Sequence, residues 1–202
     1  MSDEVVNNGR RRVLTTLTTV AGAAGAVGAA VPFIGSWQPS AKAKAAGAPV
    51  EVNIAKLEPG AMVTVEWRGK PVYVIRRPKE TIDLLEGLDE SILDDPASEN
   101  SVQPSYVSSA LRSVEGREEI LVLLGLCTHL GCAPSYRPEV GAEDLGGKDW
   151  LGGFFCRCHG SKFDMAGRVY KGVPAPTNLE IPPYKFVSDN SIVIGEDQEA
   201  SA

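Results

Sequence analysis

The sequence has few of the side chains on which metal sites and many hydrolases depend. Its 202 residues include only two histidines and four cysteines. All six lie between residues 127 and 159, inside two short stretches. Because both histidines belong to this region, none is spare for a second metal centre or for a Ser-His-Asp triad elsewhere in the chain.

The body of the chain also lacks an excess of basic residues. Residues 1–48 carry five basic and two acidic side chains, whereas residues 49–202 carry 15 basic and 24 acidic side chains, a net charge of −9. Binding to phosphate backbones requires lysines and arginines clustered on the folded surface. An acidic body therefore argues against a nucleic acid as a partner.

A long uncharged run follows the first basic cluster. Arg10, Arg11 and Arg12 precede Val13 and Leu14, and no further charge occurs before Lys42. As a helix, residues 13–34 would rise about 33 Å, enough to cross a hydrocarbon core of about 30 Å. The run predicts a single-pass membrane helix within residues 1–37.

The arginine cluster resembles the twin-arginine export signal, which is mostly bacterial: two arginines, any residue, then two apolar residues. The basic residues before the span predict a cytoplasmic N-terminus and a body outside the bacterial inner (cytoplasmic) membrane, in the periplasm. The alternative is a signal peptide cleaved near residues 41–43, although the apolar part of such signals is normally only about 7–15 residues long.

The rest of the chain divides into a linker and one head domain. Residues 38–48 are mostly small, with too little apolar bulk to pack, and predict a linker that serves as a spacer or a hinge. From residue 49 to 202 the pattern is mainly β, with one helical period over residues 78–93 and a polar loop over 94–104. Apolar runs separated by turns favour antiparallel sheets in a sandwich, with strands at 50–54, 62–67, 72–75, 120–124 and 191–194.

Two motifs carry the chemistry. The first is Cys-Thr-His-Leu-Gly-Cys at residues 127–132, and the second is Cys-Arg-Cys-His-Gly-Ser at residues 156–161. Tetrahedral zinc would leave two of the six candidate ligands unused, and two disulfides would leave both histidines without a role. The most economical assignment uses one cysteine and one histidine of each motif as ligands and pairs the other two cysteines.

Together the two motifs resemble the cluster-binding boxes of Rieske iron-sulfur proteins of the quinol-oxidising type. In that family two thiolates bind one iron of a [2Fe-2S] cluster and two imidazoles bind the other. The resemblance assigns one such cluster to the thiolates of Cys127 and Cys156 and to the imidazoles of His129 and His159. It also implies a disulfide between Cys132 and Cys158.

The resemblance extends to the surroundings of the boxes. Residues 172–176, Gly-Val-Pro-Ala-Pro, are similar to the proline-rich loop that covers the cluster in this family. Ser161 matches a serine that donates to a cluster sulfide. Phe163 stands where many high-potential members carry a tyrosine that donates to a cysteine ligand, so that bond is missing here.

Two further departures from the family lie in and between the boxes. Arg157 takes a position often held by proline, and the interval from residue 133 to 155 is long and charged at its centre. An exposed insertion is the simplest interpretation of this interval. A docking surface for a partner subunit is the alternative.

The resemblance implies a fold and a function. The fold would be an antiparallel β-sandwich head in which a cluster-binding subdomain, about 123–178, is inserted. The chain would take one electron from ubiquinol through His159, with His129 beside it, and pass it to a c-type cytochrome. Its partners would be a cytochrome b subunit and a cytochrome c subunit in a dimeric membrane complex that contributes to proton translocation.

Other Rieske proteins are the competing interpretations. A Rieske oxygenase needs a mononuclear iron held by two more histidines, which the chain does not have. A plastoquinol-oxidising complex and the small subunit of arsenite oxidase are compatible with the motifs. The proline-rich loop and the expected anchor favour ubiquinol oxidation.

Overall fold

The structure is a computed structural model, and it describes residues 7–107 and 109–197. The chain forms two compact units, one reaching to Ala45 and one from Ala46 onward. The boundary between them falls within residues 38–48, the predicted linker. Each unit is described by itself below.

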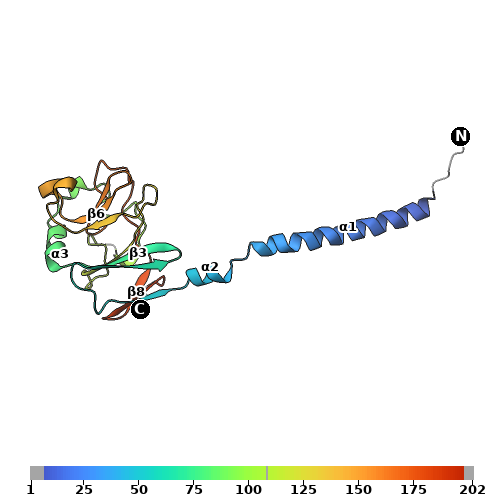
Figure 1. Cartoon of the computed structure of the whole chain (residues 1–202), viewed down its shortest axis with the longest axis horizontal. Coiled ribbons are helices and arrows are strands. Elements are labelled where there is room, and N and C mark those ends of the chain that lie inside the picture. The colour runs from blue at the N-terminus through green and yellow to red at the C-terminus, as the bar shows by residue number, and fades with distance from the viewer. Residues whose placement is uncertain (1–6, 108, 198–202) are drawn as a thin grey trace. The chain divides into compact units, whose positions relative to one another are not determined.

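The first unit contains the predicted apolar helix. Helix α1 spans Asn8–Ser36, and the side chain of Asn7 caps it by accepting hydrogen bonds from the amides of Gly9 and Arg10. Figure 1 shows it as the long helix near the N-terminus. None of its side chains is buried, and it is long and apolar enough to cross a membrane. A second short helix, α2, spans Ala41–Ala46 within the predicted linker, where alanine and lysine favour helix formation.

The core of the head lies on the sheet β2-β3-β4, formed by Met62–Trp67, Lys70–Arg76 and Ile120–Leu124. Strands β2 and β3 are joined by a two-residue turn in which Arg68 and Gly69 both have positive φ, as a tight hairpin requires. Every residue of β4 is buried, which explains its unbroken apolar sequence. This sheet therefore forms a rigid base from which the first motif starts.

A second antiparallel sheet brings the two ends of the head together. Its order is β1-β9-β8, with β1 at Val50–Asn53, β8 at Tyr184–Ser188 and β9 at Ser191–Ile194. The first strand of the head thus pairs with its last strand. In Figure 1 the red strands near the C-terminus lie beside the blue strand with which the head begins.

The third sheet is inserted between β4 and β8 in the sequence. It consists of β5 at Ser135–Arg137, β6 at Gly153–Cys156 and β7 at Ser161–Asp164, in the order β5-β6-β7. The hairpin between β6 and β7 contains the second motif. The mainly β fold with antiparallel sheets is confirmed in the described residues, and the third sheet lies in sequence within the predicted cluster-binding subdomain.

The predicted helix over residues 78–93 is shorter in the structure. Helix α3 spans Lys79–Glu86 and ends at Gly87, and a 3-10 turn, η1, follows at Glu90–Ile92. Gly87 has a poor helix propensity, and it separates the apolar pattern into two segments, one in α3 and one around η1. Leu85 and Leu93 reach the core from the two segments, so the periodic apolar residues still pack inward.

One contact links the base sheet to both ends of the first motif. The ring of Tyr73 on β3 lies against Gly125, where a Cβ atom would stand only 2.5 Å from it. The Tyr73 hydroxyl donates a hydrogen bond of 3.0 Å to the carbonyl of Pro134. Residues 125 and 134 flank the first motif, so Tyr73 fixes the points at which this loop leaves and rejoins the head.

Candidate metal centre

The two motifs form loops with the same closing hydrogen bond. In the first, the amide of Gly131 donates to the carbonyl of Cys127; in the second, the amide of Gly160 donates to the carbonyl of Cys156. Each glycine has φ close to 80°, a conformation that side chains rarely adopt. In both loops the backbone folds back over the first cysteine, with the histidine at the turn.

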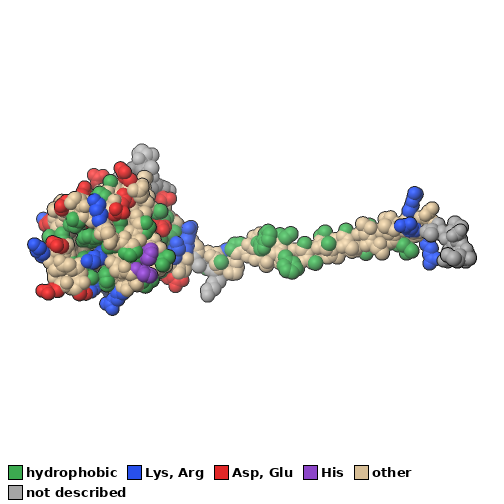
Figure 2. All heavy atoms as spheres, turned by 90° about the horizontal axis from the view of Figure 1, so that it is seen from above, with side chains coloured by type: hydrophobic (Ala, Val, Ile, Leu, Met, Phe, Trp, Pro, Cys, Tyr) green, Lys and Arg blue, Asp and Glu red, His purple; other side chains and the backbone are tan. Residues whose placement is uncertain are grey.

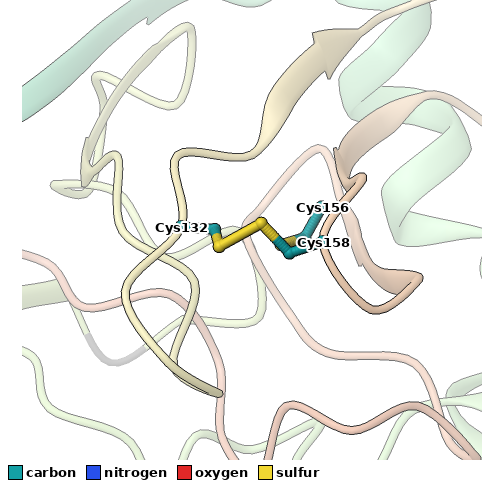
Figure 3. A group of neighbouring side chains, drawn as sticks. All are labelled: Cys132, Cys156 and Cys158. Carbon is teal, nitrogen blue, oxygen red and sulfur yellow. A yellow bond between two sulfur atoms is a disulfide. The ribbon is translucent and has the colours of Figure 1, made fainter.

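A disulfide joins the two loops. Cys132 follows the turn of the first loop, Cys158 lies in the second, and their sulfur atoms are bonded (Figure 3). This is the pairing that the family resemblance implies. The Sγ atom of Cys156 lies within 4.8 Å of both disulfide sulfurs, but a bonded sulfur is no longer a thiolate and is not available as a metal ligand.

The two remaining cysteines are free and buried. Cys127 and Cys156 are each about 2% exposed. Cys127 lies beside Cys156 and Ser161, and burial raises the pKa of its thiol. A thiol that burial keeps neutral becomes a ligand only when a metal takes the place of its proton, so occupation by a cation would offset the desolvation of the pair.

The two histidines lie on the outside of the same loops. Their ring centroids are 4.8 Å apart with the planes nearly perpendicular, His159 is exposed and His129 is half-buried. In Figure 2 they form one continuous patch on the surface of the head. The structure thus brings together two inner sulfurs and two outer imidazoles.

Ser161 and Thr128 attach the proline-rich loop to the two motifs. The Oγ atom of Ser161 accepts a hydrogen bond of 3.1 Å from the amide of Ala175. The hydroxyl of Thr128 donates one of 2.7 Å to the carbonyl of Thr177. Sequence reasoning singled out Ser161 but missed Thr128, whose position inside the first motif was the only available signal.

Phe163 is fully buried on β7, opposite Phe154 on β6. It lies two residues beyond Ser161, on the strand that leaves the second motif. A hydroxyl at this ring would be introduced into an apolar environment without access to water. A hydrogen bond to a neighbouring sulfur would therefore have little competition from solvent.

The interval from residue 133 to 155 is more ordered than an exposed insertion. Arg137 forms a two-armed ion pair with Asp144, and charged residues there are exposed as expected. However, Leu145 and Trp150 are 3% and 1% exposed, so the interval also contributes to the core. The interpretation as a wholly exposed insertion is wrong, because two large apolar side chains anchor it.

The donor set fits a [2Fe-2S] cluster with mixed ligands. Two thiols and two imidazoles, one of each from each loop, match the ligation that such a cluster requires. The buried thiols suit an inner iron, and the more exposed imidazoles suit an outer one. The same set would also satisfy zinc by chemistry alone, so the comparison with known proteins decides between them.

Residues 96–184 match the Rieske [2Fe-2S] domain, and residues 1–40 match the ubiquitinol-cytochrome C reductase Fe-S subunit TAT signal. The chain is 55% identical to the ubiquinol-cytochrome c reductase iron-sulfur subunit of Allochromatium vinosum, over 98% of this chain and 94% of that protein. It belongs to the family of Rieske iron-sulfur subunits of ubiquinol-cytochrome c reductase.

A second bacterial relative agrees with this assignment. The corresponding subunit of Bradyrhizobium diazoefficiens is 43% identical over 81% of each chain. A solved chain titled hyperthermophilic respiratory Complex III covers 88% of this chain and 98% of its own length, with 27% identity and a TM-score of 0.45.

Family membership decides several of the questions that the sequence raised. The chain is a Rieske subunit of an oxidoreductase complex, its cofactor is a [2Fe-2S] cluster, and its N-terminal segment carries a twin-arginine signal. The apolar helix and the bacterial relatives together indicate a membrane anchor. The role of each ligand residue stays a prediction, supported by the geometry above.

Loss of the disulfide is expected to loosen the centre. Cys132→Ser or Cys158→Ser frees the two loops from each other, and such a crosslink typically stabilises a fold by about 2–4 kcal/mol. We expect a lower iron content per chain after purification of the complex, measured by metal analysis and EPR. Ala133→Ser, which adds a hydroxyl to the exposed residue next to Cys132, is the control. Full retention of the cluster in both cysteine variants would make the disulfide incidental.

A hydroxyl on Phe163 is expected to raise the midpoint potential of the cluster. In Phe163→Tyr the hydroxyl donates to a cysteine ligand and stabilises the more negative reduced state. A hydrogen bond to a charged acceptor contributes about 1.5 kcal/mol, which corresponds to a rise on the order of 60 mV. Redox titration of the EPR signal measures it, with Phe154→Tyr as the control on the facing strand. Coincident midpoints for the wild type and Phe163→Tyr would contradict the prediction.

Proposed function

We propose that the chain takes one electron at a time from ubiquinol at the outer face of the bacterial inner membrane and passes it to a c-type cytochrome. The observation that carries the proposal is the arrangement of the donors. The thiols of Cys127 and Cys156 are buried, whereas the imidazoles of His129 and His159 lie together at the surface. A substrate can reach the imidazole side of such a centre without contacting its sulfurs.

The bound [2Fe-2S] cluster supplies a one-electron acceptor whose potential, in the range of about −150 to +300 mV, suits oxidation of a quinol. The proton of the quinol requires a separate acceptor, and the exposed imidazole of His159 provides one. With His159 holding the cluster, its other ring nitrogen would accept the hydroxyl proton of the quinol, while the cluster would supply the electron acceptor. His129 occupies the neighbouring position and contributes the second imidazole.

The surface around His159 suits an apolar ring with polar substituents. Leu130, the residue after His129, is 72% exposed, and Val173 and Pro174 of the proline-rich loop also reach the surface. Ser161 and Thr128 hold this loop against the two motifs. We infer that these apolar side chains receive the quinone ring while His159 binds its hydroxyl.

Within the complex, we expect a cytochrome b subunit to provide the rest of the quinol site and a cytochrome c subunit to receive the electron, in a dimeric assembly that contributes to proton translocation. The arginines before α1 favour a cytoplasmic N-terminus and a periplasmic head. The plastoquinol and arsenite oxidase alternatives lose support, because the relatives reported above are ubiquinol-cytochrome c reductase subunits.

Low-temperature EPR of dithionite-reduced membranes from cells that express the chain tests the cofactor. Mixed thiolate and imidazole ligation predicts a rhombic signal of a reduced [2Fe-2S] cluster, and copurification with a b-type haem protein would place it in the expected complex. His159→Ala should abolish the signal and the quinol oxidation together, whereas Lys171→Ala, at an exposed residue before the proline-rich loop, should leave the signal in place. A silent spectrum with stoichiometric zinc would contradict the proposal.

The linker is expected to act as a hinge, because a tethered carrier cannot contact a quinol site and a cytochrome at once. Residues 40–46 form helix α2 and its start, with the Ser40 carbonyl accepting from the Lys44 amide. Replacing Ala43 and Ala45 with proline removes two backbone donors and fixes φ at both positions, which restricts the conformations that the linker can adopt. Turnover should fall several-fold while the EPR signal stays intact, with Ala43→Ser and Ala45→Ser as the control. Unchanged turnover in the proline variant would remove the hinge from the mechanism.

A further inference from the structure

Three arginines are fully buried in the head. Arg77, Arg112 and Arg168 are at most 1% exposed, although a buried charge is costly unless it is paired or hydrogen-bonded. Only two buried carboxylates, Asp95 and Asp164, accompany them among the described residues. The buried interior therefore holds a net positive charge of one.

Two of the three arginines are held by neutral acceptors. Arg77 donates to the carbonyls of Leu111 and Met165, and Arg112 donates to those of Ala166 and Leu179. Among residues 7–107 and 109–197, neither guanidinium forms an ion pair with a carboxylate, whereas Arg168 pairs with Asp164 at 2.7 Å. Backbone carbonyls satisfy the donors of Arg77 and Arg112 without cancelling their charge.

Both guanidinium groups bind the turn that follows β7, the strand that begins in the second motif. Their acceptors include Met165 and Ala166, in the turn that follows β7, and β7 begins at Ser161 beside Cys127. At about 3.3 Å per residue, the end of this strand lies roughly 10 Å from Ser161. Phe154 and Phe163, which face each other on β6 and β7, are fully buried, so water does not screen charges in this part of the head.

Both groups stay charged at neutral pH. Burial lowers the pKa of Arg77 to about 10 and that of Arg112 to about 10, opposed by the carboxylate of Asp164 and, for Arg112, by that of Asp95. The positive charge of Arg168 acts in the same direction as burial. The field of the two guanidinium groups is therefore a permanent feature of the head under physiological conditions.

We propose that Arg77 and Arg112, which form no ion pair with a described carboxylate, raise the midpoint potential of the cluster by stabilising its reduced state through the field of their positive charges. Reduction adds one electron and hence one negative charge at the centre, and two buried cations lower the free energy of that charge. The inference rests on the cluster being bound as proposed above. Such a field compensates in part for the hydroxyl that Phe163 lacks.

The same arginines have a structural role that the test must separate from the charge. Arg112 binds carbonyls at residues 166, 167 and 179, on both sides of the proline-rich loop, so its loss also loosens the loop. Lysine keeps the charge but loses most of these hydrogen bonds, and glutamine loses both. The two substitutions at one position therefore differ mainly in charge.

The test is a redox titration of the EPR signal in the assembled complex, at low and high salt. Arg112→Gln and Arg77→Gln should each lower the midpoint, and the matching lysine variants should stay closer to the wild type. Asp164→Asn and Asp95→Asn remove buried negative charge, so they should raise the midpoint. The shifts should persist at high salt, because buried charges are poorly screened.

The decisive result is a midpoint that falls in the arginine-to-glutamine variants and rises in the aspartate-to-asparagine variants. Simple loosening of the head does not predict shifts of opposite sign. Equal midpoints for glutamine, lysine and wild type, with the cluster signal intact, would overturn the inference and leave the proposed function untouched. If the glutamine variants do not retain the cluster, the aspartate variants decide. An unchanged or lowered midpoint in both of them overturns the inference as well.

Discussion

The structure of the centre depends on the junction between two loops that come from different parts of the chain. One loop leaves the base sheet after β4, and the other connects β6 to β7. Each loop supplies only one cysteine and one histidine of the predicted ligand set. The positions of the four ligands relative to one another therefore depend on how the two loops contact each other. The Cys132–Cys158 disulfide makes this contact covalent, and the two remaining thiols and both imidazoles are placed relative to it.

The fold around this junction separates an inner side from an outer side. Tyr73 fixes the first loop to the base sheet, and Ser161 and Thr128 fix the proline-rich loop to both motifs. The sulfurs consequently lie against the core, where water does not reach them, and the imidazoles lie at the surface. The division suits the proposed transfer of an electron and a proton from one substrate, because the thiols are protected from water while the imidazoles are accessible.

The buried arginines of the head are the next feature that bears on the same centre, through the electric field of their charges. A buried arginine is usually found with a carboxylate, yet Arg77 and Arg112 bind neutral acceptors, among them backbone carbonyls of the turn after β7. The same bonds that hold this turn in place therefore leave positive charge at the end of the strand that begins in the second motif. Stability and redox tuning are connected through one group of side chains.

The sequence determined the chemistry of the site and the class of the fold. Ligand types and their spacing are local properties, so the two motifs could be recognised without a structure, and so could the apolar helix and the five strands with clear apolar runs. It did not reveal β5, β6, β7 and β8, because short strands such as Gly153–Cys156 carry little periodic pattern and are stabilised by their neighbours. The helix predicted over residues 78–93 was too long for a different reason. Gly87 ends α3 inside an apolar pattern that looks continuous in the sequence.

Only the tertiary structure decided which groups are buried, paired or exposed. The roles of Thr128 and Tyr73 depend on partners about 50 and 60 residues away, Thr177 and Pro134, and the charge balance around Arg112 depends on acceptors from three segments. Such contacts are long-range in sequence and leave no local signature. The residue types in the two motifs therefore identified the donor groups of the centre. The packing of distant segments determined which hydrogen bonds fix the loops and which buried charges act on them.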